Sequence, residues 1–272
     1  MARAVRELAA RHGVRPKKSL GQHFLVDPNL ARSIVRWAGV GPGDRILEVG
    51  AGLGSLTVAL ARAGGRVVAV EVDRAAVAAL SEVVDGIDGV EVLAGDASRL
   101  NWAEVVDDEP WKMVSNLPYN IAVPVVMELL ERAPQVRELT VMVQREVGER
   151  MVAGPGQDQY GGVSVRVAYH AEGRMIRRVP PSVFWPEPKV ESVIVRLVRR
   201  PPPVDTSPER LFPVVAEGFA QRRKTMRNAL VRLGLERAAA GAVLAGCGLA
   251  PNVRAEQLGL REFACLADAI HG

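Results

Sequence analysis

Between residues 45 and 153, short apolar runs alternate with segments of helical periodicity. The apolar runs are rich in Val, Ile and Leu along their whole length, which is typical of strands buried on both faces of a parallel sheet. We expect strands at 45–49, 66–72, 90–94, 112–115 and 139–143, and helices at 53–63, 74–84, 121–132 and 144–151. This alternation predicts an α/β fold, a mostly parallel sheet covered by helices.

The pattern changes after this region. Residues 163–170 and 193–197 alternate apolar and polar side chains, which predicts two antiparallel strands closing one edge of the sheet. A proline-rich stretch at 199–203 is typical of a semi-rigid linker. Helical periodicity then returns at 208–220, 222–233, 235–245 and 260–270. We therefore predict two domains, a sheet domain at 1–200 and a small all-helical domain at 205–272.

Charge is unevenly distributed along a chain whose net charge is +4. Basic residues concentrate in 1–18, 166–200 and 221–237, whereas 71–109 is strongly acidic. Separate basic clusters favour a polyanionic partner such as a nucleic acid.

No apolar run approaches the length of a membrane span. The N-terminal segment has no apolar core typical of a signal peptide, and we expect an amphipathic helix or a disordered basic arm there. Cys247 and Cys265 are the only cysteines and form no CxxC motif, which favours free, buried thiols in a reducing cytoplasm. The four histidines are scattered, so no metal site is expected.

A glycine-rich turn follows the first predicted strand of the sheet. Gly50, Gly52 and Gly54 stand where the strand ends and the next helix begins, a position where glycine lets the backbone approach a ligand closely. A nicotinamide-binding turn has the spacing GxGxxG, whereas here the glycines are spaced by two and two. This spacing favours a different nucleoside cofactor.

Acidic residues mark the ends of three predicted strands. Glu48 precedes the glycines, Glu71 ends the second strand, and Asp96, followed by Ala97, comes after the third. The carboxyl ends of parallel strands form the edge at which open α/β sheets bind ligands. There, Glu71 is suited to accept hydrogen bonds from ribose hydroxyls, and Asp96 from the amino group of the cofactor's adenine.

The tetrapeptide Asn116-Leu117-Pro118-Tyr119 follows the fourth predicted strand. The N6 atom of adenine is a poor nucleophile because its lone pair is delocalised into the ring. If the Asn116 side-chain oxygen and the Leu117 carbonyl accept its two hydrogens, the nitrogen moves toward tetrahedral geometry and the lone pair is freed. Tyr119 offers a stacking face, and Phe184 in a proline-rich loop is suited to sandwich an extruded base against it.

Taken together, these motifs resemble the KsgA family of ribosomal RNA adenine dimethyltransferases. The resemblance runs over nearly the whole chain and rests on segments 18–25, 48–54, 116–120, 184–192 and 221–230. It implies a Rossmann-like class I methyltransferase sheet, mostly parallel with an antiparallel edge, and a small C-terminal all-helical domain. It also implies S-adenosylmethionine as cofactor, without a metal.

The resemblance assigns roles to individual residues. Cofactor contacts are expected from Gln22, His23, Leu25, Gly50, Gly52, Glu71, Asp96, Ala97 and Asn116. Catalytic contacts to the target adenine are expected from Asn116, Leu117, Tyr119 and Phe184, and contacts to RNA phosphates from Arg222, Arg223, Lys224 and Arg227. The family usually has Asn where His23 stands, so this contact runs either through a ring nitrogen or through the backbone.

The substrate that the resemblance implies is a pair of adjacent adenines in the hairpin near the 3′ end of 16S rRNA, within the assembling 30S subunit. We expect a cytoplasmic protein that acts as a monomer. Two alternatives remain: a macrolide-resistance type of enzyme acting on 23S rRNA, and a ribosome-assembly factor that binds RNA with weak catalysis. Leu117 favours the small-subunit branch, because the 23S enzymes usually have Asn-Ile-Pro-Tyr at this motif.

Overall fold

The computed structural model describes residues 2–17, 20–221 and 223–271. The chain forms two compact units. The first runs to Gly148 and includes Gly173–Arg199, and the second comprises Glu149–Glu172 and the chain from Arg200 onward. Residues 149–172, which the predicted division placed with the sheet, thus pack with the C-terminal helices.

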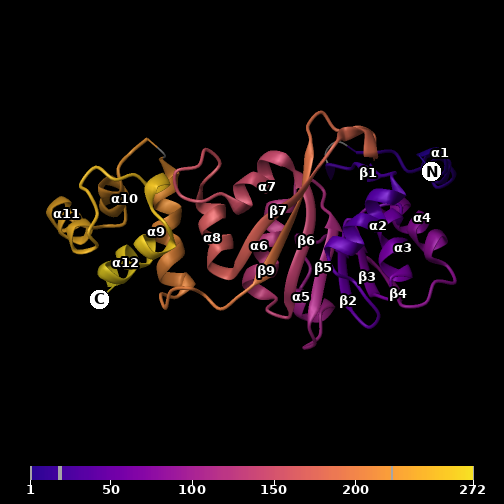
Figure 1. The fold of residues 1–272 in the computed structure, drawn as a ribbon, viewed down its shortest axis with the longest axis horizontal. Helices are drawn as coiled ribbons and strands as arrows, with labels where there is room; N and C mark the ends of the chain where they lie inside the picture. Colours follow the sequence, from indigo (N-terminus) through magenta and orange to yellow (C-terminus); the bar gives the residue numbers. More distant parts are fainter. Residues whose placement is uncertain (1, 18–19, 222, 272) are drawn as a thin grey trace. The chain divides into compact units, whose positions relative to one another are not determined.

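The first unit is built on a seven-stranded sheet with the strand order β4-β3-β2-β5-β6-β9-β7 (Figure 1). The strands are β2 (Arg45–Val49), β3 (Arg66–Glu71), β4 (Val90–Ala94), β5 (Trp111–Asn116), β6 (Val136–Gln144), β7 (Ala171–Val179) and β9 (Ser192–Arg199). The helices are α1 (Ala2–Arg11), α2 (Pro28–Trp37), α3 (Ser55–Arg62), α4 (Arg74–Val84), α5 (Trp102–Val105) and α6 (Ala122–Arg132), together with the first half of α7 (Arg145–Val152), whose second half belongs to the second unit. Strands β2 to β6 pair in parallel, and β9 is antiparallel to β6.

Both faces of this sheet are covered. Consecutive residues of β2 point to opposite faces, yet Ile46 and Leu47 are fully buried and Val49 is nearly so. Ile46 packs with residues of α2, α3 and α4. The prediction of a Rossmann-like, mostly parallel sheet with an antiparallel strand near its edge is confirmed. The predicted amphipathic N-terminal helix is also present, as α1, and its Val5 and Leu8 pack in one cluster with Ala79 of α4.

A two-stranded sheet lies apart from the main one in the first unit. Strand β1 (Phe24–Leu25) pairs antiparallel with β8 (Phe184–Trp185), which follows the short 3₁₀ helix η2 (Pro181–Val183). This pairing fixes the segment before α2 to the proline-rich loop, two parts of the chain that are distant in sequence.

The predicted strand at 163–170 is wrong, because this segment is helix α8 (Gly162–His170). The Ser164 hydroxyl accepts from the Gly161 N–H at the start of the helix and donates to the Arg150 carbonyl. Val165 and Tyr169, four residues apart, are buried in the core of the second unit. Packing of this helical face therefore overrides the strand preference of its valines.

The second unit is all-helical. It contains α8, α9 (Pro208–Ala220), α10 (Met226–Arg232), α11 (Arg237–Gly246), the 3₁₀ helix η3 (Ala255–Gln257) and α12 (Leu260–His271). Its core is apolar, with Leu211, Phe263 and Leu266 fully buried.

The prediction of free, buried thiols is wrong. Cys247 and Cys265 form a disulfide with their Cα atoms 5.9 Å apart, and the Cys265 residue is exposed. Their separation of 18 residues gave no sign of pairing. Packing of α11 near α12 brings them within the distance that a disulfide requires.

The contact between α7 and β9 offers a test of core packing in the first unit. A Cβ atom on Gly148 would lie 2.2 Å from Cγ2 of Val193, a short and stiff side chain of β9. We expect Gly148→Ala to lower the free energy of unfolding by about 1–3 kcal/mol, because the helix has to move away from the sheet.

Gly246 in α11 is the matched control, since nothing lies within 4 Å of its Cβ position. We expect Gly246→Ala to leave the stability unchanged or to raise it by at most about 1 kcal/mol. Chemical denaturation measures both variants, and equal unfolding midpoints would contradict the packing described here.

Candidate cofactor and adenine site

Three segments that are distant in sequence meet at the carboxyl end of the central strands. Gly50 has φ +73°, and a Cβ atom there would lie 2.6 Å from Cδ of Pro118. Gly21 has φ +60°, and its Cβ position lies 2.9 Å from the Tyr119 backbone nitrogen. Any side chain at either position would separate the segments, so glycine is required for the glycine-rich turn and the 20–25 segment to touch the Asn116–Tyr119 loop.

Two adjoining cavities lie between these segments. The first holds about 50 Å³ and is bordered by residues of all three: Gln22, His23, Leu25, Glu48, Gly50, Gly52, Glu71, Asn116, Leu117 and Tyr119 are among its lining. The second holds about 220 Å³ and extends from Gly50 and Glu71 to Asp96, Ala97 and Asn120. All nine residues predicted to contact the cofactor therefore border one or the other of these two cavities, which share Gly50 and Glu71.

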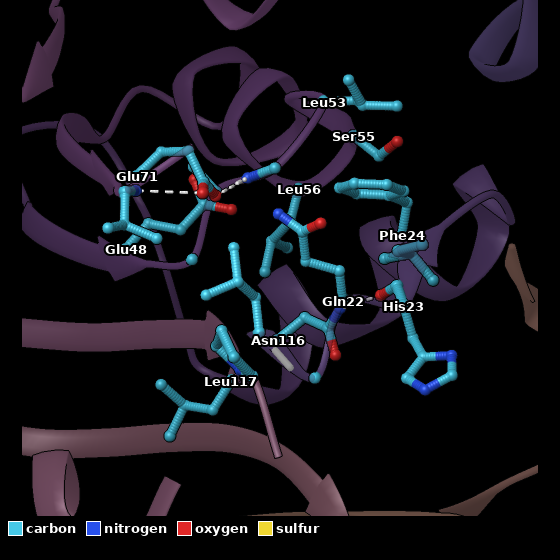
Figure 2. A pocket seen from close by; sticks show the side chains of 18 of the residues that line it. Gln22, His23, Phe24, Glu48, Leu53, Ser55, Leu56, Glu71, Asn116 and Leu117 are labelled. Atoms are coloured by element: carbon cyan, nitrogen blue, oxygen red, sulfur yellow. Dashed lines mark hydrogen bonds between the residues drawn. The ribbon is translucent and has the colours of Figure 1, made fainter. Parts of the chain in front are cut away.

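Asn116 is held in a defined orientation at the end of β5. Its side-chain Nδ2 donates a hydrogen bond to the His23 carbonyl oxygen at 2.9 Å. Figure 2 shows the Asn116 side chain at the first cavity, next to Gln22. Because the amide nitrogen is committed to His23, the amide oxygen is the atom that Asn116 has to offer to a donor.

Glu71 is almost fully buried at the end of β3. Its Oε2 accepts from the Gly52 N–H at 2.9 Å, and its Oε1 accepts from the N–H groups of Val72 and Asp73 at 3.0 and 2.9 Å. These bonds fix the carboxylate against the glycine-rich turn. Each carboxylate oxygen accepts about two hydrogen bonds, so Oε2 retains capacity for a ligand hydroxyl.

Glu48 is the most deeply buried carboxyl group of the site, with 1% of the residue exposed. Its Oε2 has no hydrogen-bond partner among the described residues. The pKa of Glu48 is raised to about 8, chiefly by burial and in part by the neighbouring Glu71 carboxylate, while the Thr57 hydroxyl acts to lower it. Figure 2 shows Glu48 and Glu71 together at one end of the cavity, away from His23.

Asp96 lies on the wall of the second cavity and is more accessible. Its Oδ1 accepts from the hydroxyl and the N–H of Ser98. The Ser98 hydroxyl and N–H, together with the charge of Arg99, lower the pKa of Asp96, so this carboxylate is ionised at neutral pH. The neighbouring Ala97 is buried and borders the same cavity.

Tyr119 and His23 face each other at the opposite side of the site, with ring centroids 5.1 Å apart. The Tyr119 hydroxyl is 2.7 Å from Oγ of Ser192, and burial raises the pKa of this phenol. The His23 Nδ1 is 2.7 Å from the Pro186 carbonyl oxygen. A carbonyl only accepts, so Nδ1 carries the proton. The His23 backbone carbonyl thus accepts from Asn116, whereas its ring donates to the proline-rich loop.

Phe184 is not among the residues that border either cavity. It is 2% exposed, its backbone pairs with Leu25, and its side chain belongs to the core cluster that contains Leu25, Val179 and Ile194. Its neighbour Trp185 stacks on Phe24, with ring centroids 6.0 Å apart. The structure thus places Phe184 in the core beside Leu25, and its role against a base stays a prediction.

The predicted RNA contacts lie in the second unit, around the start of α10. Arg223 and Lys224 are exposed in the turn before it, and Arg222 lies outside the described residues. Arg227 is partly buried, and its Nε and Nη2 donate to the Arg237 carbonyl at 3.1 and 3.0 Å. Part of the Arg227 guanidinium therefore holds α10 to α11.

Sequence reasoning missed Gly21 and Ser192. Gly21 permits the close approach to Tyr119, and the buried Ser192 hydroxyl positions the Tyr119 phenol. A glycine beside Gln22 and a serine at the start of an otherwise apolar strand are signals that could have drawn attention to both. Lys18 and Ser19, which belong to the N-terminal motif, lie outside the described residues.

Within the described part of the chain, no helix is long and apolar enough to cross a membrane. In the same residues, no group of three or more His, Cys, Asp or Glu side chains is arranged to hold a metal ion.

The family model described as "Ribosomal RNA adenine dimethylase" matches residues 13–271. The chain is 48% identical over 271 residues to the ribosomal RNA small subunit methyltransferase A of Kineococcus radiotolerans, covering 98% of this chain and 90% of that protein. It is 44% identical to the enzyme of the same name from Moorella thermoacetica, covering 96% of this chain and 94% of that protein.

Two solved structures share the fold. A dimethyladenosine transferase from Plasmodium falciparum superposes with a TM-score of 0.75 at 23% identity, covering 90% of this chain and 96% of that one. The 23S rRNA methyltransferase ErmE superposes with a TM-score of 0.70 at 25% identity, covering 92% of this chain and all of that one.

The burial of Glu48 has a measurable consequence for stability. The pKa of its carboxyl is about 8 in the folded protein and about 4.5 when exposed. The folded state therefore holds a proton that the unfolded state releases between these values, and stability falls as pH rises through this window. We expect Glu48→Gln to remove this loss of stability, which is about 5 kcal/mol at most.

Denaturation of both proteins at several pH values between 4.5 and 9 tests this expectation. The difference in unfolding free energy between variant and wild type should grow in favour of the variant up to about pH 8 and then level off. A difference independent of pH would show that Glu48 titrates normally.

Proposed function

This chain belongs to the ribosomal RNA adenine dimethylase family, and on that basis we propose how its site performs S-adenosylmethionine-dependent methyl transfer to rRNA. The substrate is 16S rRNA in the assembling 30S subunit, and the targets are the N6 atoms of two adjacent adenines in the hairpin near its 3′ end. The relatives named small subunit methyltransferase A, matched over nearly the whole chain, support this assignment.

The observation that carries the proposal is the orientation of Asn116. Its amide nitrogen is bound to the His23 carbonyl, so its oxygen is left to accept a hydrogen from an exocyclic amine. A second acceptor, the Leu117 carbonyl oxygen, accepts a hydrogen bond from the other N–H of the amine. The two acceptors draw the lone pair of N6 out of conjugation and aim it at the methyl donor, so positioning supplies most of the acceleration.

Cofactor binding is assigned to residues of the two cavities. Oε2 of Glu71 accepts from a ribose hydroxyl, and the ionised Asp96 accepts from the cofactor's adenine amino group. Gln22 contributes a buried amide whose Nε2 has no partner among the described residues, a donor suited to a carboxylate of the ligand. When bound, S-adenosylmethionine supplies an activated methyl group on a sulfonium.

The RNA is bound by the aromatic side chains of the site and by basic side chains of the second unit. Tyr119, held by Ser192, presents a face on which an extruded adenine stacks, and Phe184 supports Leu25 of the 24–25 segment from the core. Arg223 and Lys224 in the helical unit are exposed and contact phosphates, joined by Arg222 and by the remaining donors of Arg227. The enzyme acts as a cytoplasmic monomer and needs no metal.

A 23S rRNA methyltransferase is the second candidate, favoured by the fold shared with ErmE. Identity to ErmE is 25%, whereas it is 48% to the small subunit enzyme of Kineococcus radiotolerans. The small subunit is therefore the better supported substrate.

Methylation assays with separate substrates test this choice. The protein is incubated with labelled methyl donor and undermethylated 30S subunits, undermethylated 50S subunits or duplex DNA. We expect label only in 30S subunits, recovered as N6-dimethyladenosine after digestion of 16S rRNA. Label in 50S subunits would favour the second candidate, and binding to 30S without label would favour an assembly factor.

The role of Asn116 is tested by Asn116→Ala. We expect methyl transfer to fall by roughly 100-fold or more, because the variant lacks one of two positioned acceptors at the reacting nitrogen. Cofactor affinity measured by calorimetry should change much less. Asn101→Ala, which alters an exposed helix cap that borders neither cavity, is the control. Normal turnover by Asn116→Ala would overturn the clamp.

A further inference from the structure

Glu48 is a buried acid that the proposed chemistry does not use. It borders the first cavity and shares the β2 face of Ile46, 1% exposed, with one carboxyl oxygen lacking a partner in the described residues. A carboxylate in such a place is costly unless a cation or donors compensate it, so the group holds a proton instead. The charged and polar groups around Glu48 determine how strongly it holds this proton.

No cation of the described chain compensates Glu48. No lysine or arginine is among the described residues that border the first cavity. Lys17, whose segment leads to Gln22, is paired with Asp73, with Nζ and Oδ2 2.8 Å apart. The His23 ring is bonded to Pro186 and points away in Figure 2.

The groups that face Glu48 are otherwise acidic or neutral. Glu71 comes from β3, and its negative charge opposes ionisation of Glu48. Thr57 of α3 contributes a hydroxyl, and Gln22 and Asn116 contribute uncharged amides around the cavity. Within the described part of the site, a positive charge beside Glu48 is therefore missing, and a cationic ligand would supply it.

The two forms of the cofactor differ in this respect. S-adenosylmethionine carries one net positive charge, because its sulfonium adds to a balanced amine and carboxylate. S-adenosylhomocysteine has a neutral thioether and no net charge. A buried carboxyl that senses this difference distinguishes substrate from product by charge, even though the two molecules share nearly every other contact.

We propose that Glu48 links cofactor exchange to a proton: protonated in the free enzyme, it ionises when S-adenosylmethionine binds and is protonated again when the methyl group has left. On binding, its proton goes to solvent, and the carboxylate balances the positive charge of the ligand. After transfer, the sulfur is neutral, the N6 proton leaves with solvent, and Glu48 takes a proton back from solvent. Glu48 thus favours the charged cofactor over the neutral product. This inference rests on the cofactor site proposed above.

The pKa of Glu48, raised by burial to about 8, sets the range in which the linkage is measurable. Below this value, binding of S-adenosylmethionine has to expel the proton, so its affinity should rise with pH. The pH dependence of S-adenosylhomocysteine affinity should come only from ionisable groups that both ligands share, such as the amine. This shared contribution cancels in the ratio of the two affinities, so the pH dependence of the ratio reports the ionisation of Glu48.

Calorimetry on the full-length enzyme tests the proposal. Titrations at pH 6.5 in phosphate and in imidazole, two buffers whose ionisation enthalpies differ, give the number of protons released on binding. We expect S-adenosylmethionine to release up to about one proton more than S-adenosylhomocysteine does. Sinefungin, which carries an amine near the position of the sulfonium methyl, should behave like S-adenosylmethionine. From pH 6 to 8, the affinity ratio of substrate to product should rise by up to about tenfold per pH unit.

Two variants distinguish proton linkage through Glu48 from a purely structural role of this residue. Glu48→Gln keeps the shape and removes the charge, and we expect equal proton release for the two ligands and a ratio independent of pH. Glu91→Gln, at an exposed carboxylate of β4, should behave like wild type. Loss of affinity in Glu48→Gln for both ligands alike, with the proton difference retained, would assign Glu48 a merely structural role and overturn the proposal.

The wild-type titrations decide the matter even if Glu48→Gln does not fold. Binding of S-adenosylmethionine with the same proton count as S-adenosylhomocysteine would overturn the linkage while leaving the proposed cofactor site intact. Absence of binding at every pH would refute the cofactor site itself, so the two failures are distinguishable.

Discussion

The close approach of Gly50 to Pro118 is the contact on which the site depends. It joins the glycine-rich turn after β2 to the loop after β5, two neighbouring strands of the sheet. Gly21 adds the N-terminal segment to the same loop, and the bond from Asn116 to the His23 carbonyl then locks that segment in place. Cofactor contacts and adenine contacts thus form one unit, in which a displaced segment disturbs both.

Two buried glutamates at this edge are stabilised in different ways. Glu71 accepts three backbone N–H bonds, whereas Glu48 has an oxygen without a partner in the described residues. Backbone donors offset the cost of burying Glu71, so its carboxylate serves as a fixed acceptor. Glu48 has no such compensation and depends on its ligand. Glu71 therefore provides a fixed hydrogen-bond acceptor, whereas the ionisation of Glu48 responds to the charge of the bound ligand.

The sheet and most of its helices were predictable because their pattern is local. Strands β2 and β4 and helices α4 and α9 have the predicted bounds, since continuous apolar runs and helical periodicity mark them clearly. Helix α8 was not predictable in this way. Its alternating valines fit a strand, and only the packing of Val165 and Tyr169 in the second unit selects the helix.

The sequence by itself determined the chemistry of the site: the glycine-rich turn, the acidic strand ends and the Asn-Leu-Pro-Tyr motif identify residues whose type limits what they can bind. Tertiary structure alone decided how these residues are used. The Asn116 amide is oriented by the His23 carbonyl, and the His23 ring is protonated at Nδ1 because it donates to Pro186. Phe184 is buried in the core, part of the Arg227 guanidinium is bonded to α11, and Cys247 forms a disulfide with Cys265. Each of these outcomes depends on a partner distant in sequence or on burial, and neither is encoded in a local pattern.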